Sequence, residues 1–271
     1  MLFCLNFSQM KVLAQWSEGY KLLDYFYLFV VSFISNLFSA FSGGGAGIIQ
    51  LPAILFIFNT SFITALSTHK VATVALGIGA SLRFLKTIKI DKNRFSLMLI
   101  IGIPAVILGA NYISIVDDKT ARHLLGTLII LVFLYSIVQS NKGYEKIEYV
   151  SSISNNIIGF FIIGIIGFIN GSLSAGTGLL FTMWLVGWFG LTYKEAVAYT
   201  LIMVGFFYNF TGAVTLSIFA DISWSILPSL VLGSLIGGYV GAHLSLSKDN
   251  KTIKVVYQLV TLAVGVKLIF Y

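Results

Sequence analysis

The sequence predicts an all-helical integral membrane protein made of two inverted-topology repeats, each of about five helical segments. Three observations predict this fold: an apolar composition, a pattern of segment lengths that occurs twice, and opposite charge in corresponding loops of the two halves. Hydrophobic residues make up 58% of the 271 residues and charged residues 10%, whereas soluble domains carry about 25% charged residues. A soluble chain of this size could not bury so much apolar surface, and the same composition excludes disorder. Because the apolar stretches are continuous rather than alternating, they indicate helices and not a membrane β-barrel.

Apolar runs follow the order long, short, long, long, long in each half of the chain. In the first half they lie at 25–41, 47–58, 62–85, 95–114 and 121–139. In the second half they lie at 153–173, 178–189, 192–219, 223–244 and 252–270. A shift of 131 residues superimposes the halves and places Gly176 on Gly45. We therefore expect transmembrane repeats at 25–140 and 153–271, a cytoplasmic linker at 141–152, and an N-terminal segment, 1–24, that could lie in the membrane interface.

Charge in the loops orients the two halves. The loop at 83–94 carries five lysines and arginines, whereas its counterpart at 219–223 carries only Asp221. Since basic loops stay on the cytoplasmic side, corresponding loops of the two halves lie on opposite sides of the membrane. This pattern places 83–94, 141–149 and 246–254 inside and both termini outside, in a multi-pass protein of the cell (inner) membrane.

The two short runs each follow a glycine-rich break. At 12 residues each, they would form about 18 Å of helix, roughly half of a bilayer. They are preceded by Gly43-Gly44-Gly45-Ala46-Gly47 and by Ser174-Ala175-Gly176-Thr177-Gly178. Helices that begin inside the membrane, broken or re-entrant, present unpaired N–H groups and a positive dipole end, which favour an anion. The alternative is that these glycines are close-packing sites, and we prefer that interpretation for Gly233, Gly237 and Gly241.

Lys70 is the only charged residue well inside a proposed span, and His69 stands beside it. Every Asp and Glu falls in a loop or near a segment end, so a cation pathway is disfavoured and an anion is favoured. The alternatives are that Lys70 extends its amine to the outer interface and that His69 has a structural hydrogen-bonding role. The predicted substrate-binding residues combine this pair with the glycine breaks and nearby polar side chains: Gly43, Gly44, Gly45, Gly47, Gln50, Thr68, His69, Lys70, Asn170, Ser172, Ser174, Gly176, Thr177, Tyr199 and Thr200.

Enzyme motifs are incomplete in this sequence. The first glycine run is not a dinucleotide-binding fingerprint, because Ile48 occupies the place of the last glycine. The stretch from Ser172 to Gly176 falls one glycine short of a nucleophile elbow. The single cysteine, Cys4, gives no metal cluster. We therefore expect a protein that is not an enzyme, with no catalytic residue, metal or cofactor.

Three stretches of the first half resemble the sulfite exporter TauE/SafE family: Phe41 to Gly47, Ala65-Leu-Ser-Thr-His-Lys-Val71, and Ser81-Leu-Arg-Phe84 with the later Ile90-Asp91. In that family a glycine-rich break, an A-x-x-T-N-K-like stretch and a basic loop ending in Asp occur in this order. The second half, including Gly167 to Ala175, looks like the family's second repeat, so the likeness covers about residues 25–271. By position, the residues that match the motif are Gly43, Gly44, Gly45, Thr68, Lys70 and Arg83. The chain departs from it at His69, where Asn is commoner, and at Ser174-Ala175-Gly176, where a fuller glycine run is usual.

The resemblance implies transport of a small sulfur-containing or organic anion, such as sulfite, a sulfonate or sulfoacetate, driven by the proton gradient. Together with the residues, it favours a secondary transporter that works by alternating access. An anion channel is the first alternative, and an intramembrane enzyme, for which a nucleophile–base pair is missing, is the second. The expected partners are a small anionic substrate and the lipid bilayer, with no nucleic acid, and a homodimer stays open.

Overall fold

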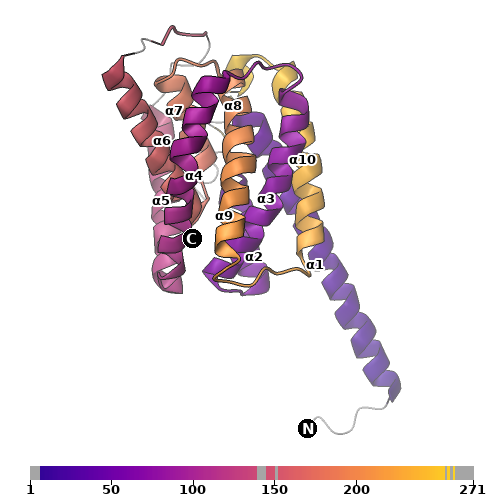
Figure 1. The fold of residues 1–271 in the computed structure, drawn as a ribbon. Coiled ribbons are helices and arrows are strands. Elements are labelled where there is room, and N and C mark those ends of the chain that lie inside the picture. Colours follow the sequence, from indigo (N-terminus) through magenta and orange to yellow (C-terminus); the bar gives the residue numbers. More distant parts are fainter. Residues whose placement is uncertain (1–6, 139–144, 150–151, 254, 257–258, 260–271) are drawn as a thin grey trace.

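The computed structural model describes residues 7–138, 145–149, 152–253, 255–256 and 259, and within these residues it is a helical bundle without strands (Figure 1). The elements in chain order are α1 (Phe7–Ser42), α2 (Ala46–Phe58), α3 (Phe62–Phe84), α4 (Lys92–Ser114), α5 (Asp118–Val138), α6 (Ile153–Leu173), α7 (Thr177–Gly187), α8 (Tyr193–Thr200), the π-helix η1 (Leu201–Tyr208), α9 (Asn209–Leu216) and α10 (Leu227–Ser247). The all-helical prediction is confirmed for this part of the chain. The last predicted run, 252–270, lies mostly outside the described residues.

Six helical stretches in the described part are long and apolar enough to cross a membrane. They are Leu23–Ser42, Phe62–Phe84, Lys92–Ser114, Ile153–Leu173, Tyr193–Leu216 and Leu227–Ser247. The helices α2 and α7, with 13 and 11 residues, reach only about 20 Å and 17 Å, whereas the hydrocarbon core is about 30 Å thick. Both short helices begin within the glycine-rich breaks, directly after Gly45 and Gly176 and one residue before the predicted runs.

Two helices differ from the predicted runs. α1 begins at Phe7 rather than at residue 25 and continues without interruption to Ser42, so the described part of the N-terminal segment is helical and continuous with the first span. The run at 192–219 is not one regular α-helix, because its centre, Leu201–Tyr208, is π-helical. π-helical segments are rare in proteins overall, but those that occur are often found at functional sites.

The pairs α1–α2 and α6–α7 form two antiparallel helix hairpins. The side chain of Gln50 in α2 reaches back to Ser32 in α1, and Trp188, directly after α7, donates to the carbonyl of Asn155 near the start of α6. From the middle of the bundle, α2 therefore runs toward the end where α3 begins, and α7 runs toward the opposite end, where α8 begins (Figure 1). The starts of the two short helices meet between these ends.

Glycines bring the long helices around these hairpins into close contact. In α10, a Cβ at Gly237 would lie 2.5 Å from the carbonyl oxygen of Phe33 in α1, and one at Gly241 would meet the same helix one turn on. The close-packing interpretation of the α10 glycines is therefore confirmed. α4 and α6 cross in the same way, since a Cβ at Gly171 would lie 2.1 Å from the carbonyl oxygen of Val106. Backbone-to-backbone contact of this kind is the usual way in which membrane helices associate.

The α3–α4 connection and the stretch that follows α10, both of which carry lysines, lie at one end of the bundle. The α3–α4 connection, the start of α6, the α7–α8 connection and the end of α10 are all at the upper end in Figure 1. There Lys146 pairs with Glu195 at 3.0 Å, and the backbone N–H of Lys194 donates to Oδ1 of Asn250. The opposite end holds the α2–α3, α4–α5 and α9–α10 connections (Figure 1). The α9–α10 connection carries Asp221 and no lysine or arginine.

Candidate site between the starts of two short helices

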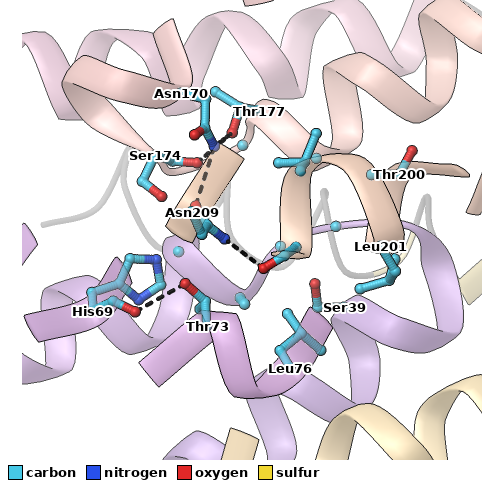
Figure 2. A pocket seen from close by; sticks show the side chains of 18 residues that line it. Ser39, His69, Thr73, Leu76, Asn170, Ser174, Thr177, Thr200, Leu201 and Asn209 are labelled. Carbon is cyan, nitrogen blue, oxygen red and sulfur yellow. Dashed lines mark hydrogen bonds between the residues drawn. The ribbon is translucent and has the colours of Figure 1, made fainter. Parts of the chain in front are cut away.

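A small cavity lies where the starts of α2 and α7 meet, and residues of α1, α3, α6, α8, η1 and α9 also line it (Figure 2). The space open to the centre of a water molecule is about 30 Å³. One buried water needs about 10–15 Å³ on this measure. In this conformation the cavity therefore has room for water or one small ion, and not for a large organic molecule.

Neither short helix has a side-chain cap, in contrast to α3, α4, α6 and α8. Ser61 caps α3, and Thr192 forms a capping box with Glu195 at the start of α8. The N-caps of α2 and α7 are instead Gly45 and Gly176, whose φ angles of 112° and 74° lie in the left-handed region, which glycine adopts at no steric cost. The first N–H groups of a helix lack partners within it. Both starts thus bring backbone donors and the positive end of the helix dipole to the cavity.

The two breaks touch each other. A Cβ at Gly44 would lie 2.3 Å from the backbone nitrogen of Leu179, and one at Gly178 would lie 3.0 Å from the Cα of Gly44. The hydroxyl of Thr182 in α7 donates to the carbonyl oxygen of Gly43 at 2.8 Å. Two helix starts that are far apart in the sequence therefore form one wall of the same cavity.

Lys70 is fully buried behind the cavity wall rather than on it. Its Nζ donates to the backbone oxygen of Asn170 at 2.7 Å, to Oδ1 of Asn170 at 3.1 Å and to Oδ1 of Asn209 at 3.4 Å. All three acceptors are neutral, and neither ion pair formed by the described residues includes Lys70. The alternative in which this lysine extends to the membrane surface is therefore wrong. Within the described part of the chain, Lys70 is a buried amine without a carboxylate partner.

Asn170 connects Lys70 with the first turn of α7. Its Nδ2 donates to Oγ1 of Thr177 at 3.0 Å, and the Thr177 hydroxyl donates to the carbonyl oxygen of Ser174 at 2.6 Å. Figure 2 shows Asn170, Thr177 and Asn209 along one side of the cavity. The buried amine, the end of α6 and the start of α7 are thus held in one hydrogen-bonded group.

His69 reaches the cavity from α3 (Figure 2). Its ring is 1% exposed, its Nδ1 is 2.8 Å from Oε1 of Gln50, and its Nε2 lies beside Gly47, where an added Cβ would be 3.2 Å away. The imidazole is therefore held from behind by an amide while its other nitrogen faces the start of α2.

The predicted binding residues divide into two groups. Those that line the cavity are Gly44, Gly45, Gly47, His69, Asn170, Ser174, Gly176, Thr177 and Thr200. Those that do not are Gly43, Gln50, Thr68, Lys70, Ser172 and Tyr199.

The second group has other contacts. The hydroxyl of Thr68 donates to the carbonyl oxygen of Thr64 and accepts from the N–H of Ser223, so it faces the α9–α10 connection. The hydroxyl of Tyr199 accepts from the backbone N–H of Asp91 at the basic end of the bundle. Ser172 donates to carbonyl groups of its own helix. Gly43, Gln50 and Lys70 lie directly behind residues of the wall.

The cavity also contains residues that the sequence analysis did not select, namely Ser39, Ala46, Thr73, Leu76, Gly178, Leu201, Val204, Gly205 and Asn209. Asn209 had a signal, because it is the only amide side chain in the span Tyr193–Leu216. Gly205 belongs to η1 and packs against α3, where a Cβ at Gly77 would lie 2.4 Å from the backbone nitrogen of Phe206. Nothing in the sequence indicates a π-helical register, so the wall formed by η1 could not be predicted.

Comparison with known proteins agrees with a transport role. The model of the sulfite exporter TauE/SafE family matches residues 28–268. The chain is 26% identical over 243 residues to the probable membrane transporter protein ORF9 of a Sinorhizobium species, covering 90% of this chain and 91% of that protein. It is 25% identical to a probable membrane transporter protein of Haemophilus influenzae, with 90% and 93% covered, and 23% identical to the probable membrane transporter protein YunE of Bacillus subtilis, with 92% and 98% covered. No solved structure matches it. The family match begins within α1 and includes every described helix from α2 to α10, and the chain belongs to the sulfite exporter TauE/SafE family of membrane transporters.

Proposed function

We propose that this protein is a secondary transporter that binds a small anion between the starts of α2 and α7 and moves it across the membrane by alternating access. The observation that carries the proposal is the meeting of two uncapped helix starts at a small polar cavity. Half-helices whose N-termini point at an anionic substrate near the bilayer midplane are a recurrent feature of secondary transporters. Sulfite, a sulfonate or sulfoacetate are the candidate substrates, and the proton gradient is the driving force.

The buried amine of Lys70 supports an anionic ligand. Removing a charge from water costs several kcal/mol per ion even after the protein relaxes, and the described residues around Lys70 offer only neutral oxygens. An anion in the cavity would supply the missing negative charge one hydrogen-bonded layer away, through Asn170 and Thr177. Bound anion and buried amine would then stabilise each other.

The opposed directions of α2 and α7 support alternating access between two inverted halves. Each hairpin enters from a different end of the bundle and stops at the cavity, so rocking one half against the other would open the site to one side at a time. The positive-inside rule assigns the cytoplasm to the basic end and the outside to the end where α1 begins.

The test is uptake of labelled sulfite into proteoliposomes by the wild type, Lys70→Gln and the matched control Lys86→Gln, which removes the same charge from an exposed position. We expect saturable uptake by the wild type and the control, and none by Lys70→Gln. Thermal unfolding checks folding and binding together, because a ligand at 100 times its Kd stabilises the protein by about 2.7 kcal/mol.

Saturable uptake and sulfite stabilisation by Lys70→Gln at wild-type levels would contradict the role given to this lysine. Sulfite and sulfoacetate that neither stabilise nor are carried by the wild type would contradict the substrate class. Large, non-saturating anion currents would favour a channel instead.

A further inference from the structure

A chain of buried hydrogen bonds behind the cavity determines which nitrogen of His69 carries its proton. The hydroxyl of Ser32 donates its single proton to the carbonyl oxygen of Leu230 at 2.7 Å. The Ser32 hydroxyl can therefore only accept a hydrogen bond from Gln50. The side-chain nitrogen Nε2 of Gln50, which can donate, must then be the atom that lies 2.7 Å from the Ser32 oxygen. The amide of Gln50 also contacts the hydroxyl of Ser234 at 3.3 Å. Its oxygen is thereby turned toward His69.

An amide oxygen accepts hydrogen bonds and cannot donate. Nδ1 of His69, 2.8 Å from Oε1 of Gln50, must therefore carry a hydrogen in every protonation state that keeps this bond. In the neutral imidazole the second nitrogen, Nε2, is then an acceptor with a lone pair. His69 lines the cavity, and its Nε2 lies beside Gly47, a wall residue at the start of α2.

We infer that His69 takes up a proton at Nε2 whenever an anion binds in the cavity, so that the site carries an anion and a proton together. A lone pair repels the oxygens of an anion, whereas the N–H of an imidazolium donates to them. The proton comes from water on the side to which the site is open, forms the Nε2–H bond, and returns to water when that bond breaks after the anion leaves. For a monovalent anion the loaded site has gained no net charge. This inference rests on the proposed function and deepens it.

The charges around His69 make the two binding events depend on each other. Among the described residues that line the cavity, His69 is the only titratable side chain. Lys70 lies behind the wall, and its Nζ is directed to Asn170 and Asn209. The other polar side chains here are uncharged: Ser39, Thr73, Asn170, Ser174, Thr177, Thr200 and Asn209 in the cavity wall, and Ser32, Asn36, Gln50 and Ser234 in the hydrogen-bonded chain behind it. None of these can neutralise an imidazolium. Its negative partner is the anion, and thermodynamic linkage then requires that the proton strengthen anion binding equally.

The test uses methanesulfonate, because its sulfonate group stays ionised between about pH 5 and pH 8, the range in which histidine changes charge. Any dependence of its affinity on pH then belongs to the protein. Calorimetric titration in two buffers with different ionisation enthalpies also counts the protons taken up for each anion bound. The variants are His69→Gln, which offers an amide donor at every pH, and the matched control His123→Gln, which makes the same replacement at an exposed site on α5.

For the wild type and His123→Gln, we expect the affinity for methanesulfonate to fall about tenfold for each pH unit above the pKa of His69 in the anion-free protein. About one proton should be taken up for each anion bound. For His69→Gln, we expect an affinity that does not change with pH and no proton uptake. Wild-type binding that is independent of pH would overturn this inference and leave the proposed function intact. So would a His69→Gln variant with the same pH dependence as the wild type. Absence of anion binding by the wild type at every pH would instead overturn the proposed function itself.

The variant Gln50→Glu provides a second test, because it should change the pH profile of anion binding, which a purely structural role of Gln50 and His69 would leave unchanged. A carboxylate against Nδ1–H favours the imidazolium, since an opposite charge within hydrogen-bond distance shifts a pKa by about 1–3 units. We expect the midpoint of the pH profile for methanesulfonate binding to move to higher pH by about one unit or more. If the midpoint of the pH profile for methanesulfonate binding stayed at the wild-type value, the inference that Gln50 controls the protonation of His69 would be overturned.

Discussion

Replacing Gly44 by alanine tests the contact between the two helix starts. The φ angle of Gly44 is 156°, and an added Cβ would lie 2.3 Å from the backbone nitrogen of Leu179 and 2.6 Å from the backbone carbon of Gly178. The backbone strain costs about 1–3 kcal/mol, and forcing a methyl group into a packed site costs a further 1–3 kcal/mol or so. We expect a loss of about 2–6 kcal/mol in the free energy of unfolding, together with loss of transport because the starts of α2 and α7 are pushed apart.

The matched control is Gly126→Ala in α5, where an added Cβ meets nothing within 4 Å. Alanine in a helix interior is favoured over glycine by about 0.5–1 kcal/mol, so this variant should be as stable as the wild type or slightly more so. The assay is denaturant unfolding in detergent for stability and sulfite uptake into proteoliposomes for transport. If Gly44→Ala matched Gly126→Ala in both measurements, the two breaks would not be in contact in the working protein.

Two further variants test the helix contacts around the site. Gly237→Ala should lower the free energy of unfolding by about 1–3 kcal/mol, because the added Cβ would lie 2.5 Å from the carbonyl oxygen of Phe33. The affinity for sulfite should not change. A free energy of unfolding equal to that of the wild type would contradict the tight crossing of α1 and α10. Thr182→Val removes the donor to the carbonyl oxygen of Gly43 and the partner of the Thr200 hydroxyl, which should cost about 1–3 kcal/mol for the buried polar groups left unpaired. Unfolding curves like those of the wild type would show that this bond does not hold the two hairpins together.

The sequence was sufficient to locate the helix starts, because a glycine run permits the left-handed backbone conformation from which a short apolar helix can begin. Gly45 and Gly176 are the N-caps of α2 and α7. The spacing of the α10 glycines likewise indicated close packing, and Gly237 packs against α1. These features are local, since each depends on backbone conformation or on the absence of a side chain.

The orientation of side chains around α3 could not be predicted. Successive residues of a helix point about 100° apart, so Thr68, His69 and Lys70 cannot all face one cavity. In an amphipathic helix the apolar stripe shows which face is inside, but 72% of the apolar window of α3 is buried, and no such stripe exists. Tertiary contacts therefore decide that His69 faces the cavity while Lys70 lies behind it.

The π-helix η1 is the second feature that sequence reasoning missed, and for a similar reason. Its shifted hydrogen-bond register accompanies the close approach of Gly205 to α3, where Gly77 leaves room for the backbone of Phe206. A regular helix over the same residues would present Val204, Gly205 and Asn209 at different angles. The amide of Asn209 thus contacts Lys70 because of a backbone register that only the packed structure specifies.

The most direct test of an anion site between the starts of α2 and α7 is a crystal structure with selenite, a heavier analogue of sulfite that can be located by the anomalous scattering of selenium. We expect a selenium peak between Gly44–Gly47 and Gly176–Gly178, within hydrogen-bond distance of backbone N–H groups of both helix starts. Selenium bound only at the basic connections on the end of the bundle, with none in the cavity, would contradict the account.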